Sequence, residues 1–240
     1  MEITGQRVII MGGSSGIGLA TAQMLVKAGA EVTIAGRSRD KIEAAIEQLG
    51  EHARGSVVDA TSTPELQAFF REQGAFEHLV ISVSGAAGAG AFPTLDLQHL
   101  RQGFEAKFWP QVAIAQIGLE TLQSEGSITF ITAGSSRTAR PGTAGLAAIN
   151  GALDVMVPTL AVELRPRRVN AVSPGVIATP WWDRVGESFR NDYFAQVAAS
   201  APVGRVGQPE DVAQAIVFLI QNTFMTGSVI DCDGGARLVS

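Results

Sequence analysis

Residues 7–22, RVIIMGGSSGIGLATA, contain the pattern that decides the fold of this chain. Residues 8–11 form an apolar run that is long enough for a buried strand. A glycine-rich segment, residues 12–18, comes next, and an apolar pattern with a helical period opens at Leu19. The expected order is therefore strand, glycine turn and helix, which is the order that a nucleotide-binding loop requires.

Each glycine of this segment has a physical role in such a loop. Gly12 permits the tight turn, Gly16 lets the backbone approach a ligand without a Cβ in the way, and Gly18 lets the helix lie close to the sheet. The helix N-terminus offers free N–H groups and the positive end of its dipole to a pyrophosphate. An ordinary strand–helix turn is the alternative. The predicted loop contacts are Gly12, Ser14, Ser15, Gly16, Ile17 and Gly18.

The end of the second expected strand, residues 31–35, indicates which nucleotide binds. An NAD enzyme presents Asp or Glu there to the adenosine 2′-hydroxyl, whereas this chain has Gly36, Arg37 and Ser38. A guanidinium can hydrogen-bond a 2′-phosphate in two places and lie flat on the adenine. We therefore predict NADP(H) as the cofactor. The alternative is that Arg37 and Arg39 form a solvated pair that opens the next helix.

Composition and charge place the chain among globular proteins with one domain, residues 1–240, because 46% of its 240 residues are hydrophobic and 17% are charged. A net charge of −5 without a basic stripe argues against nucleic-acid binding. The single cysteine, Cys232, excludes an internal disulfide and a CxxC metal site, and we expect it to be a small buried filler. The three histidines lack metal-ligand spacing, so we expect no metal. We find no signal segment and no apolar run of membrane length, which predicts a cytoplasmic protein without membrane contact.

The rest of the chain alternates expected strands and helices. The further strands are expected at residues 56–58, 78–81, 127–132, 169–172 and 228–230. The helices are expected at residues 64–73, 96–123 with a kink at Pro110, 143–164 with Pro158 inside, and 209–220. Because each parallel strand pair needs a crossover helix, this alternation predicts an α/β fold with a single doubly wound, Rossmann-type parallel sheet of about seven strands.

Two strand ends add candidate contacts. Asp59 follows the third expected strand and could accept a hydrogen bond from the adenine amino group; alternatively, Asp59 or Ser62 caps the next helix. Residues 82–90 form a second glycine-rich segment at the carboxyl end of a strand, where ligands bind in open parallel sheets.

These motifs resemble those of the short-chain dehydrogenase/reductase family over essentially the whole chain. Residues 12–18 match its cofactor loop, with Met11 in place of the usual Thr, and residues 170–175 and 233–235 also match. Residues 82–85, SVSG, stand where the family has Asn-Asn-Ala-Gly, and only the final Gly is kept. The resemblance implies that Thr179 contacts the nicotinamide carboxamide. The cofactor contacts that it implies are Asp59, Ala60, Ser84, Gly85, Asn150, Pro174, Gly175, Ile177 and Thr179.

The family's catalytic residues do not carry over. Its acid is a Tyr followed four residues later by a Lys, which lowers the Tyr pKa and holds the nicotinamide ribose, with an upstream Ser and a supporting Asn. The resemblance places Leu146 at the Tyr position, Asn150 at the Lys position, Ala133 at the Ser position and Lys107 at the Asn position. The only tyrosine, Tyr193, is followed four residues later by a valine, so no Tyr-x-x-x-Lys exists in any register.

Three residues are candidates for the missing chemistry. A two-residue slip would bring Ser135 to the substrate, although a capped turn is an equal alternative. Asn150 could hydrogen-bond the ribose hydroxyls, but a neutral amide supplies no charge. Lys107 could project into the cleft as a proton donor or as an anchor for an anionic substrate; the alternative is a snorkelling surface lysine. Arg137 and Arg140 are placed either to meet a substrate carboxylate or to be solvated.

An excursion at residues 181–201 carries aromatic side chains, four of which we interpret as a lid over the nicotinamide or, alternatively, as a subunit contact. These side chains are Trp181, Trp182, Phe189 and Tyr193. The apolar helices around residues 104–122 and 144–164 resemble those through which relatives form dimers and tetramers, so we expect a homodimer or homotetramer.

Three functions remain open at this point. The first, which we favour, is an NADP(H)-dependent reductase of a small molecule with an activated C=O, C=N or C=C bond, because less alkoxide charge develops there than on a simple ketone. The second is a sensor or partner protein that binds NADP(H) without turnover. The third is a lyase or isomerase on the same scaffold, with Lys107 or Ser135 as the acid–base group.

Overall fold

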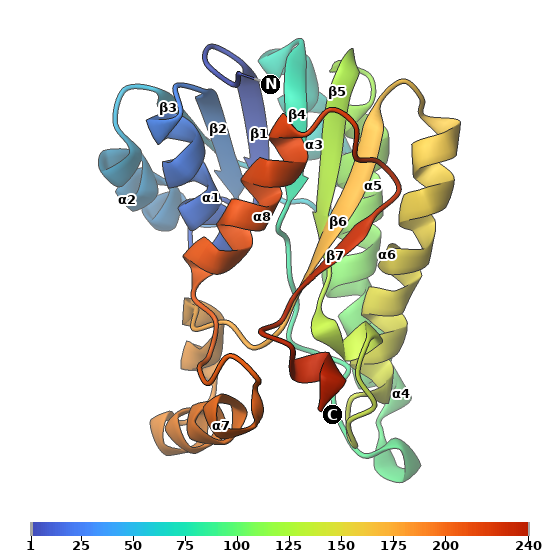
Figure 1. Ribbon diagram of the computed structural model, residues 1–240. Helices are drawn as coiled ribbons and strands as arrows, with labels where there is room; N and C mark the ends of the chain where they lie inside the picture. The colour runs from blue at the N-terminus through green and yellow to red at the C-terminus, as the bar shows by residue number, and fades with distance from the viewer. Residues whose placement is uncertain (1, 240) are drawn as a thin grey trace.

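Seven parallel strands form one sheet in the order β3-β2-β1-β4-β5-β6-β7 in the computed structural model, which describes residues 2–239 (Figure 1). The strands are β1 Arg7–Met11, β2 Glu31–Gly36, β3 Ala53–Val57, β4 Phe76–Ile81, β5 Leu122–Ile131, β6 Arg168–Pro174 and β7 Val229–Cys232. The α-helices are α1 Gly16–Lys27, α2 Arg39–Leu49, α3 Thr63–Gln73, α4 Leu97–Gly103, α5 Trp109–Gly118, α6 Ala144–Glu163, α7 Glu187–Ser200 and α8 Pro209–Gln221. Short 3₁₀ turns are η1 Phe92–Thr94, η3 Gly134–Ser136, η4 Pro180–Arg184 and η5 Ala236–Leu238, and η2 Phe104–Phe108 is a π-helical turn.

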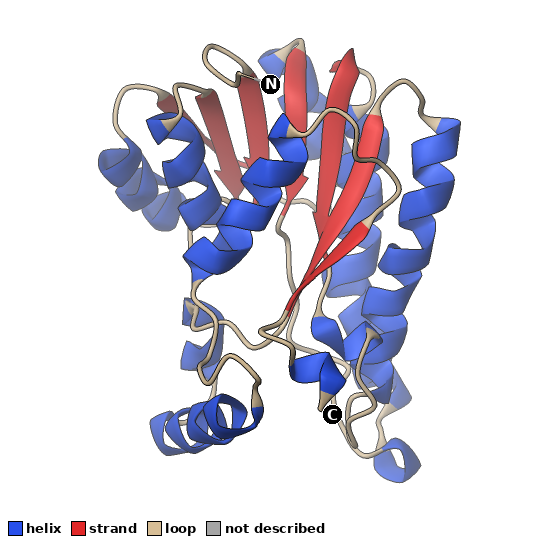
Figure 2. Ribbon diagram, in the orientation of Figure 1, coloured by secondary structure: helices blue, strands red, loops and turns tan. Residues whose placement is uncertain are grey.

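Helices cover both faces of the sheet, as Figure 2 shows. Alternate residues of each strand face opposite layers: Ile10 belongs to the apolar cluster with α1, α2 and α8, and Ile9 belongs to the cluster with α3, α5 and α6. Both side chains are at most 1% exposed. A fully buried aliphatic side chain stabilises the fold by about 1.5–3 kcal/mol, so this two-sided burial holds the sheet in register.

The strand order reverses between β1 and β4. The chain runs outward from β1 to β3 and then returns to place β4 on the other side of β1. Such a reversal opens a crevice beyond the carboxyl ends of the strands, where ligands bind in doubly wound folds. In Figure 1, α7, η5 and the C-terminus lie beyond these ends. The predicted doubly wound parallel sheet is thus confirmed.

The expected helix at residues 96–123 is wrong in its extent. α4 passes into the π turn η2 and then into α5, which ends at Gly118, and β5 begins at Leu122. Pro110 lies at the start of α5 and has no N–H to donate to the carbonyl of Ala106, so the π turn, rather than a kinked helix, accommodates it. The polar start of β5 has no strand signal in its sequence and is fixed by pairing, since Leu122 lies opposite Phe76.

Within residues 2–239, α6 is the one helix long and apolar enough to cross a membrane by length and composition, with 20 residues and a mean hydropathy of 1.5. The expectation that the chain has no apolar run of membrane length is therefore wrong by that measure. A third of the stretch (33%) is buried, and Leu153 and Val157 pack in the cluster beneath the sheet. An apolar helix of a protein core can have the same length and composition, and α6 packs against the core through Leu153 and Val157.

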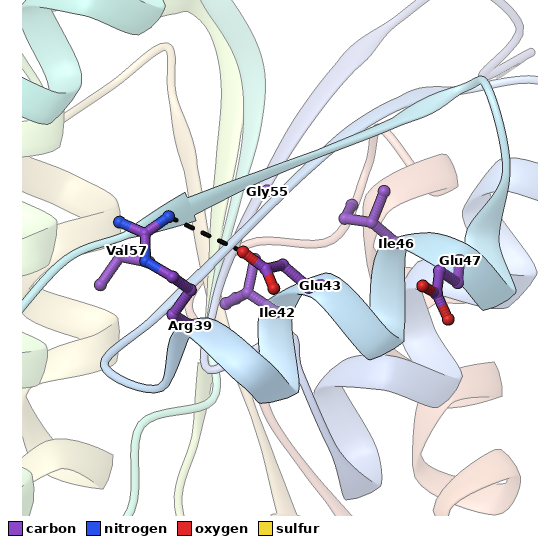
Figure 3. A pocket seen from close by; sticks show the side chains of 7 residues that line it. All are labelled: Arg39, Ile42, Glu43, Ile46, Glu47, Gly55 and Val57. Carbon is purple, nitrogen blue, oxygen red and sulfur yellow. Dashed lines mark ion pairs between the residues drawn. The ribbon is translucent and has the colours of Figure 1, made fainter.

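A shallow groove of about 610 Å³ lies between α2 and β3 (Figure 3). Ile42 and Ile46 form its floor under Gly55, where an added Cβ would lie 2.4 Å from Ile42 Cγ2. Arg39 and Glu43 form an exposed ion pair at 3.8 Å on its rim. The groove lies along the edge strand β3, two strands away from the reversal between β1 and β4, so it is not the predicted cofactor crevice.

Candidate functional site

The loop between β1 and α1 leaves the N-terminus of α1 open. Ser15 is the N-cap of α1 in extended backbone, and its side chain makes no capping hydrogen bond. Gly16 has φ +53°, and a Cβ there would lie 3.2 Å from Thr179 Cγ2. The loop and the Thr179 segment therefore face each other across a space that a larger residue would fill. The uncapped N–H groups are suited to binding an anion such as pyrophosphate.

Arg37 and Asp59, the residues predicted to contact the adenosine, follow the ends of β2 and β3. Arg37 is exposed at the end of β2, and Ser38 is the N-cap of α2 without a side-chain cap. Asp59 Oδ1 accepts hydrogen bonds from Thr61 N at 2.9 Å and from Thr61 Oγ1 at 2.8 Å. These two bonds, and then the charge of Arg37, lower the pKa of Asp59. Asp59 thus holds its own loop.

Ser62, rather than Asp59, is the N-cap of α3, because Ser62 Oγ accepts from Glu65 N at 3.4 Å. Ala60 is buried between Asp59 and this cap.

The exit from β4 is tied to the segment that follows β6. Trp181 Nε1 donates to the Gly85 carbonyl at 3.0 Å, and Ser84 Oγ donates to the same carbonyl at 3.4 Å. Ile177 is buried under the loop, and its carbonyl accepts from Trp182 Nε1 at 2.9 Å. The indole N–H groups of Trp181 and Trp182 therefore fix the segment that follows β6. The bond from Trp181 crosses the crevice to the β4 exit.

The end of β6 is packed closely against β7. A Cβ at Gly175, just after Pro174, would lie 2.8 Å from Asp233 Cα. The glycine of the matched motif at residues 170–175 thus allows two neighbouring strand ends to approach each other.

Asn150 is buried on α6, one turn after Leu146, and is only 4% exposed. Its Nδ2 donates to Ser135 Oγ at 3.1 Å and to the Leu146 carbonyl at 2.9 Å. Its Oδ1 is buried and has no hydrogen-bond partner within residues 2–239. The structure thus brings Asn150 and Ser135 together and leaves one acceptor available for a ligand hydroxyl. Ala133 precedes η3 and adds no polar side chain.

Lys107 lies in the π turn η2, and its side chain is buried, with the residue 8% exposed. Its Nζ donates to the Thr132 carbonyl at the end of β5 at 2.9 Å. Burial lowers the pKa of Lys107 to about 8, and the charge of Asp154 opposes that decrease. The alternative of a snorkelling surface lysine is wrong, because η2 packs against α6 and directs this side chain inward.

The sequence reasoning missed Asp154, which lies one turn after Asn150 on α6 and is 9% exposed. Ser136 Oγ donates to Asp154 Oδ2 at 2.6 Å, and Arg137 Nε lies 3.7 Å from the same oxygen. Arg137 also pairs with Asp231 at 3.5 Å. The Nε of Arg137 is therefore shared by two carboxylates, and the expectation that Arg137 meets a substrate carboxylate stays a prediction. An acid in the apolar α6 sequence was the signal that could have identified Asp154.

Arg140, the other candidate for a substrate carboxylate, forms no ion pair among the residues that the structure describes. The expectation for Arg140 therefore stays a prediction.

The aromatic excursion is a packed cluster with Trp182 at its centre. Its ring centroid lies 4.9 Å from Trp181, 5.3 Å from Tyr193 and 5.4 Å from Phe194. Phe189 stacks on Tyr193 at 6.0 Å and is 59% exposed, and Phe194 was not predicted. The four predicted aromatic side chains thus gather on one segment, η4 and α7, beyond the strand ends (Figure 1).

A cavity of about 380 Å³ lies beside the ends of β6 and β7. Cys232 was expected to be a small buried filler; it packs against the apolar cluster but is only half-buried and lines this cavity, and burial raises the pKa of its thiol. The charged side chains around the cavity are paired, with Arg205 on Asp211 at 2.6 Å and Arg237 on Asp231 at 3.1 Å. Among residues 2–239, no group of three metal-ligating side chains gathers anywhere.

The family relation follows from comparison with known proteins. A family model described as Enoyl-(Acyl carrier protein) reductase matches residues 12–237. The short-chain dehydrogenase/reductase ATR9 of Stachybotrys chlorohalonatus is 30% identical over 98% of each chain. The chain belongs to the short-chain dehydrogenase/reductase family. This membership confirms the oxidoreductase class predicted from the sequence.

Two solved structures of this family are close in fold. A small-chain dehydrogenase in complex with NADPH is 34% identical, with a TM-score of 0.86, and the match covers 98% of this chain and 99% of that one. An NADPH-bound short-chain oxidoreductase of Pseudomonas aeruginosa PAO1 with an atypical catalytic center is 28% identical, with a TM-score of 0.86, over 96% of each chain. The fold prediction is confirmed, and the NADPH in both neighbours agrees with the predicted cofactor.

Proposed function

We propose that this member of the family is an NADP(H)-dependent oxidoreductase with a non-standard active site. The cofactor part of the proposal is supported by the uncapped N-terminus of α1, the exposed Arg37 and the absence of a carboxylate at the end of β2. Gly36 lacks a side chain, and a Cβ there would lie 3.6 Å from Ser14 Oγ, so Ser14 lies beside the strand end that Arg37 follows. When bound, NADPH supplies a hydride.

The observation that carries the catalytic part is the buried amine of Lys107 at the end of β5. Among residues 2–239 its ammonium hydrogen-bonds one carbonyl, that of Thr132, so two N–H groups remain to donate to a substrate atom that gains negative charge. With a pKa of about 8, Lys107 can release a proton near neutral pH. Asn150 Oδ1, which has no protein partner among the described residues, would accept from a ribose hydroxyl of the cofactor.

The substrate class follows from the loss of the family's acid at its own position. Leu146 stands at the Tyr position and cannot donate a proton, so the proton has to come from Lys107, which stands at another position of the site. A positioned acid typically contributes about 10²–10⁴-fold to a rate. Substrates with an activated C=O, C=N or C=C bond need less of this contribution. The cluster around Trp182 would exclude water and favour an apolar substrate.

The first test is a titration of the purified protein with NADPH and with NADH, followed by tryptophan and nicotinamide fluorescence. We expect NADPH to bind more tightly, and Arg37→Ala to remove about 10–100-fold of that preference, as one bidentate charge-assisted contact would. Lys41→Ala, which changes an exposed cation of α2 close to Arg37 in sequence, is the matched control and leaves the preference intact. Equal binding of both nucleotides contradicts the NADP(H) proposal.

The second test presents the NADPH complex with imines, enones and ketones. Oxidation of NADPH with an imine or enone supports the reductase. Binding without turnover of any class supports the alternative of a sensor or partner protein. Conversion of an added substrate without any change in NADPH absorbance supports a lyase or isomerase.

We also propose that the chain is one domain that acts in the cytoplasm as a homodimer or homotetramer. The outer face of α6 exposes Val155 (71%) and Val162 (63%), and α5 exposes Trp109 (53%) beside it. Burial of these side chains against a second copy would remove an apolar surface from water. A monomeric mass in solution at micromolar concentration would contradict this assembly.

A further inference from the structure

A cluster of buried polar side chains lies between η2, η3 and α6, and Asp154 is its only carboxylate. Asp154 is 9% exposed on a helix whose neighbouring core residues are apolar. Its Oδ2 is held by Ser136 Oγ at 2.6 Å and faces Arg137 Nε at 3.7 Å, while Oδ1 is buried without a hydrogen-bond partner among the described residues. A buried carboxylate with one free oxygen is costly unless a nearby cation compensates it.

We propose that Asp154 is the positioning residue of this active site: it serves as the buried counter-charge of Lys107 and holds the loop that follows β5. The proposed pairing of the two charges is a property of the folded chain and does not depend on the proposed function. Only its expected effect on the pH dependence of kcat/KM rests on that function.

The geometry supports the pairing from three sides. η2, which carries Lys107, packs against α6, which carries Asp154. Lys107 binds the Thr132 carbonyl at the end of β5, and Asp154 binds Ser136 four residues further on, so both side chains meet the same strand end. Among the described residues Lys107 and Asp154 form no direct ion pair, so their charges attract each other through the buried cluster, where the effective dielectric is low. Asp154 accordingly opposes the lowering of the Lys107 pKa.

The other charged or titratable groups on the elements around Lys107 are placed differently. Glu105 of η2 and Arg101 of α4 are exposed, and His99 of α4 accepts weakly from Gly88 N at 3.5 Å. Arg137, after η3, is divided between Asp154 and Asp231. Glu163 lies at the far end of α6. Asp154 is therefore the buried negative charge available to Lys107 within residues 2–239.

The direct test uses the small number of lysines. Only Lys27, Lys41 and Lys107 occur in the chain, so ¹³Cε labelling of lysine gives three resonances, and Lys107→Met assigns one of them. Each resonance is followed from pH 6 to pH 11 by NMR. We expect Asp154→Asn to lower the pKa of Lys107 by about one pH unit, since it removes the compensating charge while its amide oxygen still accepts from Ser136.

Two further variants make the test specific. Glu105→Gln removes an exposed carboxylate two residues from Lys107 and should leave that pKa within about 0.2 pH units, because solvent screens it. Asp154→Ser removes the charge with a smaller side chain and replaces the Asn variant if that variant does not fold. An unchanged Lys107 pKa in the folded Asp154 variant overturns the inference.

The kinetic arm separates this inference from the proposed function. If Lys107 is the proton donor, kcat/KM for reduction falls as pH rises through its pKa, and Asp154→Asn moves that fall to lower pH by about the NMR shift, or about tenfold in rate at a fixed pH above it. A shifted NMR titration without turnover of any substrate supports the charge pair and contradicts the reductase. Turnover with an unshifted Lys107 pKa supports the reductase and contradicts the charge pair.

Discussion

The two halves of the crevice differ in how they relate to the rest of the family. At the end of β1 and β2, the glycine loop, the open N-terminus of α1 and the exposed Arg37 form a surface that ligand atoms complete. At the end of β5 and on α6, the resemblance to the family places Ala133, Leu146 and Asn150 where its Ser, Tyr and Lys stand. The cofactor half depends on backbone geometry, whereas the catalytic half depends on a few side chains.

This difference has a physical cause. Phosphate binding uses backbone N–H groups and glycine conformations, so most substitutions at the loop create clashes; a Cβ at Gly18 would lie 2.2 Å from the Gly12 carbonyl oxygen. The catalytic side chains can be exchanged without altering the sheet, provided that buried polar atoms find partners. Here Lys107, Asn150 and Asp154 have partners in η3 and β5 but keep acceptors and donors to spare. We therefore propose that the catalytic half has been rebuilt while the cofactor half is kept.

The largest expected effect comes from Lys107→Met, which tests whether the rebuilt half performs chemistry. We expect kcat for reduction to fall by about 10²–10⁴-fold, because the variant removes the proton donor and its charge. NADPH affinity should change little, since Lys107 does not border the glycine loop. Steady-state kinetics and nucleotide titration measure the two quantities. Lys27→Met, on the surface side of α1, is the control; an equal loss in both variants would contradict a catalytic role for Lys107.

The same substitution should stabilise the fold, and the effect should depend on pH. Burial lowers the Lys107 pKa from 10.5 to about 8, so the unfolded state binds more protons between these values. Stability of the wild type therefore rises with pH across this window, and the cost of the buried charge is fully present below pH 8. We expect Lys107→Met to raise the free energy of unfolding by about 2 kcal/mol at pH 7 and by less near pH 10.

Urea denaturation at pH 7, 9 and 10 measures this trend. Lys41→Met, at an exposed position, should show neither the gain nor its pH dependence. If Lys107→Met instead lowers the free energy of unfolding at pH 7, Lys107 stabilises the core, and its burial does not lower stability in favour of function.

The sequence was sufficient for the strand, loop and helix that form the cofactor half because their signals are local. The strand, the glycine spacing and the helix lie within residues 7–22, and the register of β1 with β2 and β4 follows from their apolar runs. The limits of β5 were not predictable in this way. Its first residues, Leu122–Gly126, are strand only because β4 lies beside them, and pairing of this kind has no local signal.

For the catalytic half, the sequence predicted which of the family's residues are missing. It did not predict the contacts that Lys107 and Arg137 make. The absence of Tyr-x-x-x-Lys follows from residue counts alone. Whether Lys107 points inward depends on the π turn before Pro110, and the binding of Arg137 by Asp154 and Asp231 joins three segments that are distant in the sequence. Spacing cannot reveal such contacts, because they depend on how α6, η3 and β7 meet.

A smaller effect is expected where the two halves meet, at Asn150. Asn150→Ala should weaken NADPH binding by about 2–13-fold, because it removes one acceptor for a ribose hydroxyl, and a hydrogen bond contributes about 0.5–1.5 kcal/mol. Ser135→Ala is the matched control, since it removes the partner of Asn150 Nδ2 and keeps Oδ1 in place. Isothermal titration of both variants decides: an equal weakening would assign the effect to the position of the side chain and contradict a direct ribose contact.

The smallest effect is expected at the tie across the crevice. Trp181 Nε1 binds the Gly85 carbonyl at 3.0 Å, and the Arg184 guanidinium lies 4.9 Å from the Trp181 ring centroid. Trp181→Phe keeps an aromatic ring for the packing against Trp182 and Arg184 but loses the hydrogen bond between the β4 exit and η4. Since one neutral hydrogen bond is worth about 1 kcal/mol, we expect NADPH to dissociate about 2–5-fold faster in stopped-flow fluorescence. Trp182→Phe is the control, because it loses the bond to the Ile177 carbonyl on the same side of the crevice. Faster NADPH dissociation in that variant alone would show that the hydrogen bond within the lid, and not the one across the crevice, slows the release of NADPH.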